Sequence, residues 1–248
     1  MRSSQSSPIE APAWLTATPY AHRGLHGPGR VENSRGAFEA AVAAGFGIEL
    51  DVQLSRDGRA MVFHDYALDR LTDETGKVAE RSAAELAAIR LRGQDEGIST
   101  LAEILSLIAD RGPVLVEVKA DRRRVATLCR DVARSLESYK GRAAVISFNP
   151  EVGRWFARHA PEVVRGLVVS EENKRGLRGR VERRLALWCA RPHFLAYDIR
   201  DLPSRFAADA RARGRPILTW TVRNARDAEV AAVYADQIIH ELPARNGR

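Results

Sequence analysis

Short apolar runs alternate with stretches of helical periodicity along almost the whole chain. The runs have the length of buried β-strands, and the stretches between them repeat apolar residues three or four positions apart, as one face of a helix does. The predicted strands are residues 19–23, 47–53, 114–118, 143–148, 163–169, 194–197, 216–221 and 237–240. Because strands that alternate with helices usually pair in parallel, the pattern predicts an α/β fold.

The predicted helices begin and end at residues of suitable type. Asn33 or Ser34 caps the first helix, Gly45 ends it, and Asn149-Pro150 opens a later one. Further helices are expected within the basic segment 121–142 and at residues 100–109, 172–189, 204–213 and 224–233. Almost every pair of consecutive strands is therefore joined by a predicted helix.

Eight strands joined by crossover helices predict a closed TIM (β/α)8 barrel. The alternative is an open doubly wound sheet, which no glycine-rich phosphate loop supports. Residues 54–97 are too long for a plain loop, so we predict a small insertion after the second strand. The last strand lies near the end of the sequence, which predicts a short or missing last helix, with the segment around Trp14 covering the opening. The predicted division is an N-terminal extension, residues 1–18, and a single barrel domain, residues 19–248.

The composition is that of a folded globular protein. Of the 248 residues, 45% are hydrophobic and 29% are charged, which excludes disorder and a coiled coil as the main state. Cys129 and Cys189 lack a C-x-x-C partner, so we expect two buried thiols rather than a disulfide framework or a thiolate zinc site. Neither the first 20 residues nor any later stretch is apolar enough for a signal peptide or a membrane span. We expect a soluble cytoplasmic protein without stable membrane insertion.

The net charge of +7 is concentrated in two helical segments, residues 121–142 and 171–191, each with seven basic and three acidic residues. Neither segment interleaves aromatic residues as a base-stacking surface does, so we predict solvated helix faces and no nucleic-acid partner. The other interpretation of these segments is an attraction for anionic substrates or membrane surfaces.

Candidate functional residues gather where predicted strands end, which is where the active site of a βα barrel lies. His22 and Arg23 end the first strand, and His64 and Asp65 follow a short apolar run inside the insertion. Two further pairs, each two residues apart and therefore on one face of a strand, are Glu49 with Asp51 and Glu117 with Lys119.

Three carboxylates on adjacent strands, those of Glu49, Asp51 and Glu117, repel one another in a confined pocket unless a cation compensates their charge. Ligation by oxygen alone favours a hard divalent metal, Mg²⁺ or Ca²⁺. Arg23 and Lys119 add fixed positive charge, so metal and side chains together would bind an anion, phosphate above all.

The two flanking histidines, His22 and His64, complete the predicted chemistry. Histidine can accept or donate a proton near neutral pH, and cleavage of a phosphate ester needs one group in each role. The residues therefore predict an acid/base pair beside a bound phosphate.

The same residues lie in stretches that resemble the glycerophosphodiester phosphodiesterase family of metal-dependent TIM-barrel enzymes. The resemblance covers about nine tenths of the chain, in family order. The matching stretches are Ala21-His22-Arg23-Gly24, Glu32-Asn33-Ser34, Glu49-Leu50-Asp51-Val52, Asp57-Gly58, His64-Asp65 with Leu68-Asp69-Arg70-Leu71-Thr72, Val116-Glu117-Val118-Lys119, Ser147-Phe148-Asn149-Pro150 and Trp220-Thr221-Val222.

The resemblance implies hydrolysis of small-molecule glycerophosphodiesters to glycerol 3-phosphate and an alcohol. It implies that His22 and His64 are the catalytic general acid/base pair. By the same analogy the metal ligands are Glu49, Asp51 and Glu117, the phosphate is held by Arg23 and Lys119, and Trp220 lines the pocket beside the leaving group or glycerol. The insertion would cap the site and help to select the substrate.

The chain departs from the family pattern at two places. The family usually ends Asp-Gly-Ile-Ile-Thr-Asp-x-Pro, whereas residues 236–243 read DQIIHELP, and Arg223 replaces the usual Asn after Trp-Thr-Val. The alternatives in function are a cyclising phospholipase D-like lyase, a lysophospholipase D, an anion-binding barrel without turnover, or a nucleic-acid binder that uses the basic helices.

The remaining polar residues receive plainer interpretations. Asp65 is expected to orient His64 or its loop, and His240 either lines the pocket or packs against the barrel. His26, His159 and His193 are expected at the surface or in loops.

Overall fold

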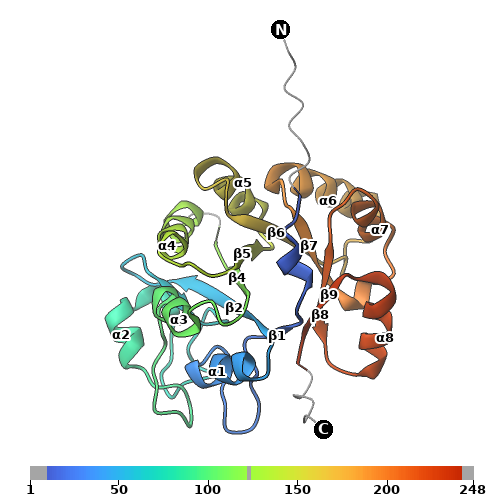
Figure 1. The fold of residues 1–248 in the computed structure, drawn as a ribbon. Helices are drawn as coiled ribbons and strands as arrows, with labels where there is room; N and C mark the ends of the chain where they lie inside the picture. The colour runs from blue at the N-terminus through green and yellow to red at the C-terminus, as the bar shows by residue number, and fades with distance from the viewer. Residues whose placement is uncertain (1–9, 122–123, 242–248) are drawn as a thin grey trace.

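A computed structural model describes residues 10–121 and 124–241. Within these residues, eight parallel strands close into a barrel, because the first strand pairs with both the second and the last (Figure 1). The barrel strands are β1 (Tyr20–His22), β2 (Gly47–Leu54), β4 (Val114–Val118), β5 (Ala143–Ser147), β6 (Val164–Val169), β7 (Phe194–Asp198), β8 (Ile217–Val222) and β9 (Gln237–His240). The predicted TIM barrel is confirmed, and each predicted strand agrees with the observed one to within one residue at either end.

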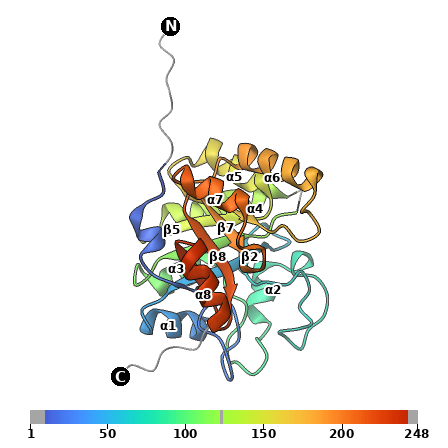
Figure 2. The same cartoon turned by 90° about the vertical axis from the view of Figure 1, so that its right-hand side faces the viewer.

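Helices surround the barrel on its outer side (Figures 1 and 2). They are α1 (Arg35–Ala43), α3 (Leu101–Ile108), α4 (Val125–Glu137), α5 (Pro150–His159), α6 (Leu177–Ala190), α7 (Arg205–Ala212) and α8 (Ala225–Tyr234). Ser34 and Asn149 cap α1 and α5 with their side chains, as the sequence predicts. No helix follows β9 up to Glu241, and Leu242 and Pro243 of the family's last motif lie outside the described residues.

The predicted start of α6 is wrong by five residues. Asn173 adopts a left-handed conformation and Gly176 caps the helix, which begins only at Leu177. The carboxylate of Glu171 is engaged elsewhere, since it accepts hydrogen bonds from Tyr197 and Ser204. Tertiary contacts therefore keep this segment out of the helix that its periodicity predicts.

The insertion after β2 builds a small unit of its own. Its strand β3 (Ala60–Val62) pairs antiparallel with β2, and the 3-10 helix η2 (Val78–Glu80) and α2 (Ala83–Ala88) follow. Seven buried apolar side chains form its separate core: Met61, Phe63, Leu68, Val78, Leu86, Leu91 and Ile98. The antiparallel strand fixes the backbone that carries His64 beside the end of β2.

Alternate side chains of the strands serve the two sides of the sheet. On β2, Ile48 and Leu50 pack outward against the helices, whereas Glu49 and Asp51 lie on the opposite face. The amino end of the barrel is filled by Leu15 of the 3-10 helix η1 (Ala13–Thr16), whose carbonyl accepts a 3.0 Å hydrogen bond from the Tyr20 hydroxyl. The opening that the sequence assigns to the segment around Trp14 is thus the amino end, which leaves the carboxyl end for a site.

The two cysteines differ in their burial. Cys129 is a buried thiol, as predicted, but Cys189, at the end of α6 beside Pro150, is only half-buried.

Among the described residues, none of the helices is both long and apolar enough to cross a membrane.

Candidate active site

A buried acidic cluster lies at the carboxyl ends of two neighbouring barrel strands. Glu49 and Asp51 of β2 are 2% and 1% exposed, and Asp51 stands opposite Glu117 in the register of β2 and β4. Oxygens of the three carboxylates lie within 4.8 Å of one another. Strand pairing thus produces the convergence that the two-residue spacing predicts.

Two cations and one amide hold the cluster in place. Lys119 Nζ lies 3.1 Å from Asp51 and 2.8 Å from Glu117. Arg23 approaches Asp51 to 3.3 Å with its guanidinium, and its backbone N–H donates to Glu49. Asn33 donates to the Asp51 carboxylate at 2.9 Å and accepts from the Asp51 backbone N–H. Both carboxylate oxygens of Asp51 therefore have polar partners that fix the orientation of the side chain.

The protonation of the cluster shows an excess of negative charge. Burial, together with Asp51 and Glu117, raises the pKa of Glu49 well above its ordinary value. Burial also raises the pKa of Glu117, although Lys119 opposes the shift. Burial disfavours the ionised form of Asp51 as well, but Lys119 and Arg23 keep its pKa below the ordinary value.

These residues fit a divalent metal ion. Three carboxylates face two cations, so one negative charge is uncompensated when all three are ionised; burial first, and repulsion from Asp51 and Glu117 second, raise the pKa of Glu49. A hard cation held by carboxylate oxygens would remove this imbalance, and the donor set contains no sulfur or nitrogen that would favour zinc.

His22, at the end of β1, is oriented by a carboxylate that the chain supplies after β9. Its Nδ1 lies 2.6 Å from Glu241 Oε1, and since a carboxylate only accepts, Nδ1 carries the hydrogen and Nε2 remains available. Arg223 donates to both oxygens of Glu241, at 2.7 and 3.0 Å. Burial lowers the pKa of His22, although the hydrogen bond with Glu241 opposes this shift. The lowered pKa favours the neutral ring.

His64, which follows β3, has a matching arrangement of side chains. Its Nδ1 lies 2.6 Å from Asp65, which in turn accepts a 2.5 Å hydrogen bond from Arg70. Burial lowers the pKa of His64 as well. Glu32 accepts hydrogen bonds from both Arg70 and Arg23 and so links this group to the acidic cluster. Each histidine is thus held by a carboxylate that an arginine fixes.

A cavity of about 420 Å³ opens onto these groups. His22, His64, Arg23 and Lys119 line it together with Glu49 and Glu117. Its apolar wall is Trp220 with Phe148, whose rings meet edge to face at 5.5 Å between centroids. The indole N–H of Trp220 donates to the Ala196 carbonyl at 3.0 Å, so this residue both packs in the barrel and faces the cavity. The eight predicted site residues therefore lie together, with Asp51 behind Lys119.

Several residues contribute to the site although the sequence predicts no role in it for them. Glu32, Asn33 and Arg70 stand in family-like stretches, but only the folded chain shows what they contact. Glu241 and Arg223 stand at the two departures from the family pattern, and they bind each other.

The other histidines are settled by their contacts. His26 lies in the loop after β1, as predicted, and its ring comes within 4.8 Å of His22 and Glu241. Arg223 already supplies a cation to that group, which disfavours a metal there. His240 packs edge to face on Phe46, outside the cavity.

A parallel eight-stranded barrel with an acidic cluster, cations and two histidines at its carboxyl end has the architecture of TIM-barrel enzymes. The sequence model of the glycerophosphoryl diester phosphodiesterase family matches residues 22–242 of this chain. The chain belongs to this family.

Known proteins that are similar to this chain include glycerophosphodiester phosphodiesterases. Two curated relatives, both glycerophosphodiester phosphodiesterases, come from Caldanaerobacter subterraneus and Bacillus altitudinis. The first is 32% identical over 55% of this chain and 60% of its own length, and the second is 38% identical over 40% and 43%. The chain thus spans about half the length of these relatives. An Oleispira antarctica phosphodiesterase, solved with the product sn-glycerol-3-phosphate, has the same fold, with a TM-score of 0.81 and 24% identity over 93% of this chain and 96% of that one.

Proposed function

We propose that the protein hydrolyses glycerophosphodiesters to glycerol 3-phosphate and an alcohol, with Mg²⁺ or Ca²⁺ held by Glu49, Asp51 and Glu117. The observation that carries the proposal is the pair of carboxylate-held histidines, His22 and His64, which line one cavity with the acidic cluster. The family and its named relatives support the same substrate class.

The charge of the site fits a phosphodiester monoanion. When all three carboxylates are ionised, they carry one net negative charge together with Arg23 and Lys119, which repels an anion, whereas a divalent ion reverses the sign. When bound, the metal supplies positive charge that stabilises the phosphoryl oxygens in the transition state. Arg23 and Lys119, both lining the cavity, bind the remaining phosphate oxygens.

The two histidines divide the proton transfers between them. Because Nδ1 of each ring is occupied by a carboxylate, Nε2 of His22 and of His64 is the atom that exchanges protons. One accepts the proton of the attacking hydroxyl, which belongs to water or to the neighbouring glycerol carbon, and the other donates a proton to the departing alcohol oxygen. Attack by the glycerol hydroxyl gives a cyclic phosphate, which a water molecule then opens to glycerol 3-phosphate while the two histidines exchange roles. The wall of Trp220 and Phe148 contacts the carbon skeleton of the bound ester.

The test is release of glycerol phosphate from glycerophosphocholine and glycerophosphoethanolamine, with Mg²⁺, Ca²⁺ or EDTA. We expect EDTA and Asp51→Ala to abolish release. His22→Ala and His64→Ala should each lower kcat by roughly 10²–10⁴-fold, the usual contribution of a general acid or base. His159→Ala, on the exposed face of α5, is the matched control and should leave kcat unchanged.

Other outcomes would replace the proposal. A cyclic phosphate as the final product would identify a phospholipase D-like lyase, and activity confined to lysophospholipids would identify a lysophospholipase D. Failure to cleave any of these esters with either metal would leave an anion-binding barrel.

A further inference from the structure

Helix α6 carries an unusual row of exposed apolar side chains. Leu177, Val181, Leu185 and Trp188 are 71%, 48%, 59% and 75% exposed, and they account for half of the large exposed hydrophobic residues in the described chain. Their spacing of four, four and three residues places them along one face of the helix. We call these four residues the α6 stripe.

Arginines flank the α6 stripe on both sides. Arg178, Arg180, Arg184 and Arg191 are exposed, and Glu182, which pairs with Arg178 at 3.0 Å, is the single acidic residue of α6. By contrast, the other basic helix, α4, has none of the large exposed hydrophobic residues. The combination of an exposed apolar row with arginines is thus a property of α6 rather than of basic helices in general.

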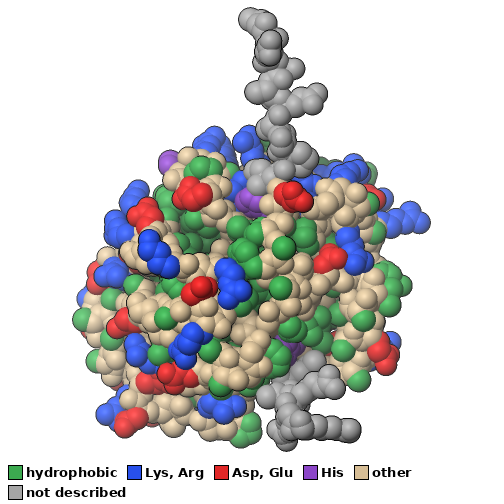
Figure 3. Space-filling model, in the orientation of Figure 1, with side chains coloured by type: hydrophobic (Ala, Val, Ile, Leu, Met, Phe, Trp, Pro, Cys, Tyr) green, Lys and Arg blue, Asp and Glu red, His purple; other side chains and the backbone are tan. Residues whose placement is uncertain are grey.

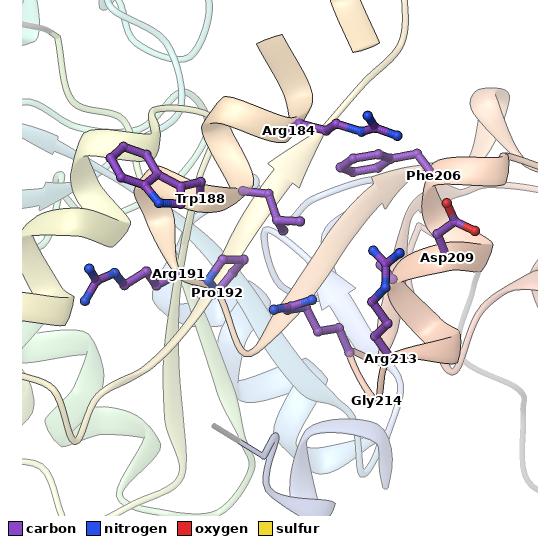
Figure 4. A pocket seen from close by; sticks show the side chains of 11 residues that line it. Arg184, Trp188, Arg191, Pro192, Phe206, Asp209, Arg213 and Gly214 are labelled. Carbon is purple, nitrogen blue, oxygen red and sulfur yellow. The ribbon is translucent and has the colours of Figure 1, made fainter. Parts of the chain in front are cut away.

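A groove of about 480 Å³ continues this surface between α6 and α7 (Figure 4). Arg184, Arg191, Arg213 and Arg215 line it, against one carboxylate, that of Asp209. Figure 3, drawn in the orientation of Figure 1, shows lysine and arginine side chains over the region of α6 and α7. The groove shares no lining residue with the active-site cavity.

We propose that the α6 stripe and the arginines of the α6–α7 groove dock the protein on an anionic phospholipid bilayer. A helix with an apolar row between cationic side chains lies in the interface of a membrane, with the row among the acyl chains and the charges at the headgroups. Lipid phosphates in the groove would neutralise the arginines that face it. The proposal does not depend on the reaction that the active site catalyses.

Two other occupants fit this surface less well. A second copy of the chain, related by a two-fold axis, would bring the same arginines against one another. A nucleic acid would neutralise the arginines, but its phosphate backbone offers no apolar partner for Leu177, Val181 and Leu185. A lipid surface satisfies both the charges and the apolar row.

The experiment is flotation of the full-length protein with vesicles of phosphatidylcholine, with and without phosphatidylglycerol, at low and at high salt. We expect binding to the anionic vesicles alone, weakened by salt. Arg184→Gln with Arg191→Gln should weaken it about 25-fold, because each basic side chain near an anionic surface contributes about fivefold. Arg130→Gln with Arg134→Gln, which removes the same charge from α4, should weaken it much less.

The apolar row has its own matched pair of variants. Leu185→Ser should reduce binding, whereas Val233→Ser, which changes a 61% exposed residue on α8, should not. Of the four tryptophans in the chain, Trp188 is the exposed one. Its fluorescence emission should shift to the blue on anionic vesicles, and this shift should be absent in Trp188→Phe.

Three results would overturn the proposal. The first is absence of binding, or equal loss in the α4 and α6 arginine variants. The second is self-association in sedimentation velocity that Leu185→Ser abolishes, which would identify an interface between copies of the chain. The third is duplex DNA binding that Arg184→Gln with Arg191→Gln weakens while vesicle binding is unaffected.

Discussion

At the scale of single residues, the two catalytic candidates are supported by equivalent pairs of side chains, a distant pair for His22 and a neighbouring pair for His64. Glu241 and Arg223 orient His22, and Asp65 and Arg70 orient His64. A carboxylate that holds Nδ1 selects the tautomer in which Nε2 faces the substrate.

Loss of the Glu241 carboxylate is expected to affect catalysis more than binding. In Glu241→Gln, the amide no longer fixes the tautomer of His22, and kcat should fall by roughly 10²–10⁴-fold with little change in KM. Arg223 is exposed, so Arg223→Gln should lower kcat by less than tenfold. Arg226→Gln, a nearby exposed residue, serves as the control in steady-state kinetics. A fall in kcat equal to that of Arg226→Gln would show that Glu241 does not position His22.

Asp65 should make the protein sensitive to acid. Burial opposes its ionisation, but hydrogen bonds from Arg70 and His64 lower its pKa from 3.8 to about 2. A carboxylate with a lowered pKa in the folded state stabilises the fold fully above its unfolded pKa, and this stabilisation is lost as the pH falls from about 4 to about 2.

The free energy of unfolding, measured in urea between these pH values, tests this. Asp65→Asn should flatten the decline, whereas Asp69→Asn, at an exposed position four residues later, should leave it unchanged. An identical decline in Asp65→Asn and the wild type would contradict the role of the Arg70 and His64 contacts.

At the scale of elements, the turn between β1 and α1 shapes the site. Arg23 and Gly24 both adopt left-handed conformations, with φ of 56° and 78°. This turn directs the Arg23 backbone N–H at Glu49. A Cβ on Gly24 would lie 2.8 Å from the backbone of Ala37 in the first turn of α1, so only glycine allows the turn to approach the helix.

Gly24→Ala and Gly29→Ala separate strain from crowding. Gly29 has a similar φ of 76° but open space around its Cα, so alanine there should cost only the left-handed conformation, about 1–2 kcal/mol. Gly24→Ala adds the clash with Ala37 and should be the more destabilising in chemical unfolding. Equal losses would mean that the turn yields without cost.

At the scale of the whole molecule, the two ends of the barrel have different tasks. The carboxyl end carries the cavity, and the amino end is filled by Leu15, which is fully buried. Residues at the amino end of a TIM barrel contribute stability rather than chemistry.

Leu15→Ala should therefore lower the free energy of unfolding by about 2–5 kcal/mol, the cost of a cavity in a packed core. The kcat of the protein that remains folded should not change. Leu177→Ala, which truncates a 71% exposed leucine, should be neutral within about 0.5 kcal/mol. A lower kcat in folded Leu15→Ala would show that the two ends are coupled.

The sequence by itself determined the strands of the barrel, and it predicted eight site residues whose side chains the fold brings together. The signals of the strands and of the paired site residues are local, since apolar periodicity marks each strand and a two-residue spacing puts Glu49 with Asp51, and Glu117 with Lys119, on one face. Trp220 was predicted only from the resemblance to the family. The division into an extension and one domain, and the roles of the site residues, stay predictions.

Only the tertiary structure decided which residues support the site. Glu241 meets His22 because β9 pairs with β1 at barrel closure, across 219 positions of sequence. The start of α6 likewise depends on what Glu171 contacts, and the apolar face of α6 is exposed because none of the elements in residues 10–121 and 124–241 packs on it. Local patterns carry no record of contacts that form between distant segments, and these contacts orient the side chains that the sequence identifies.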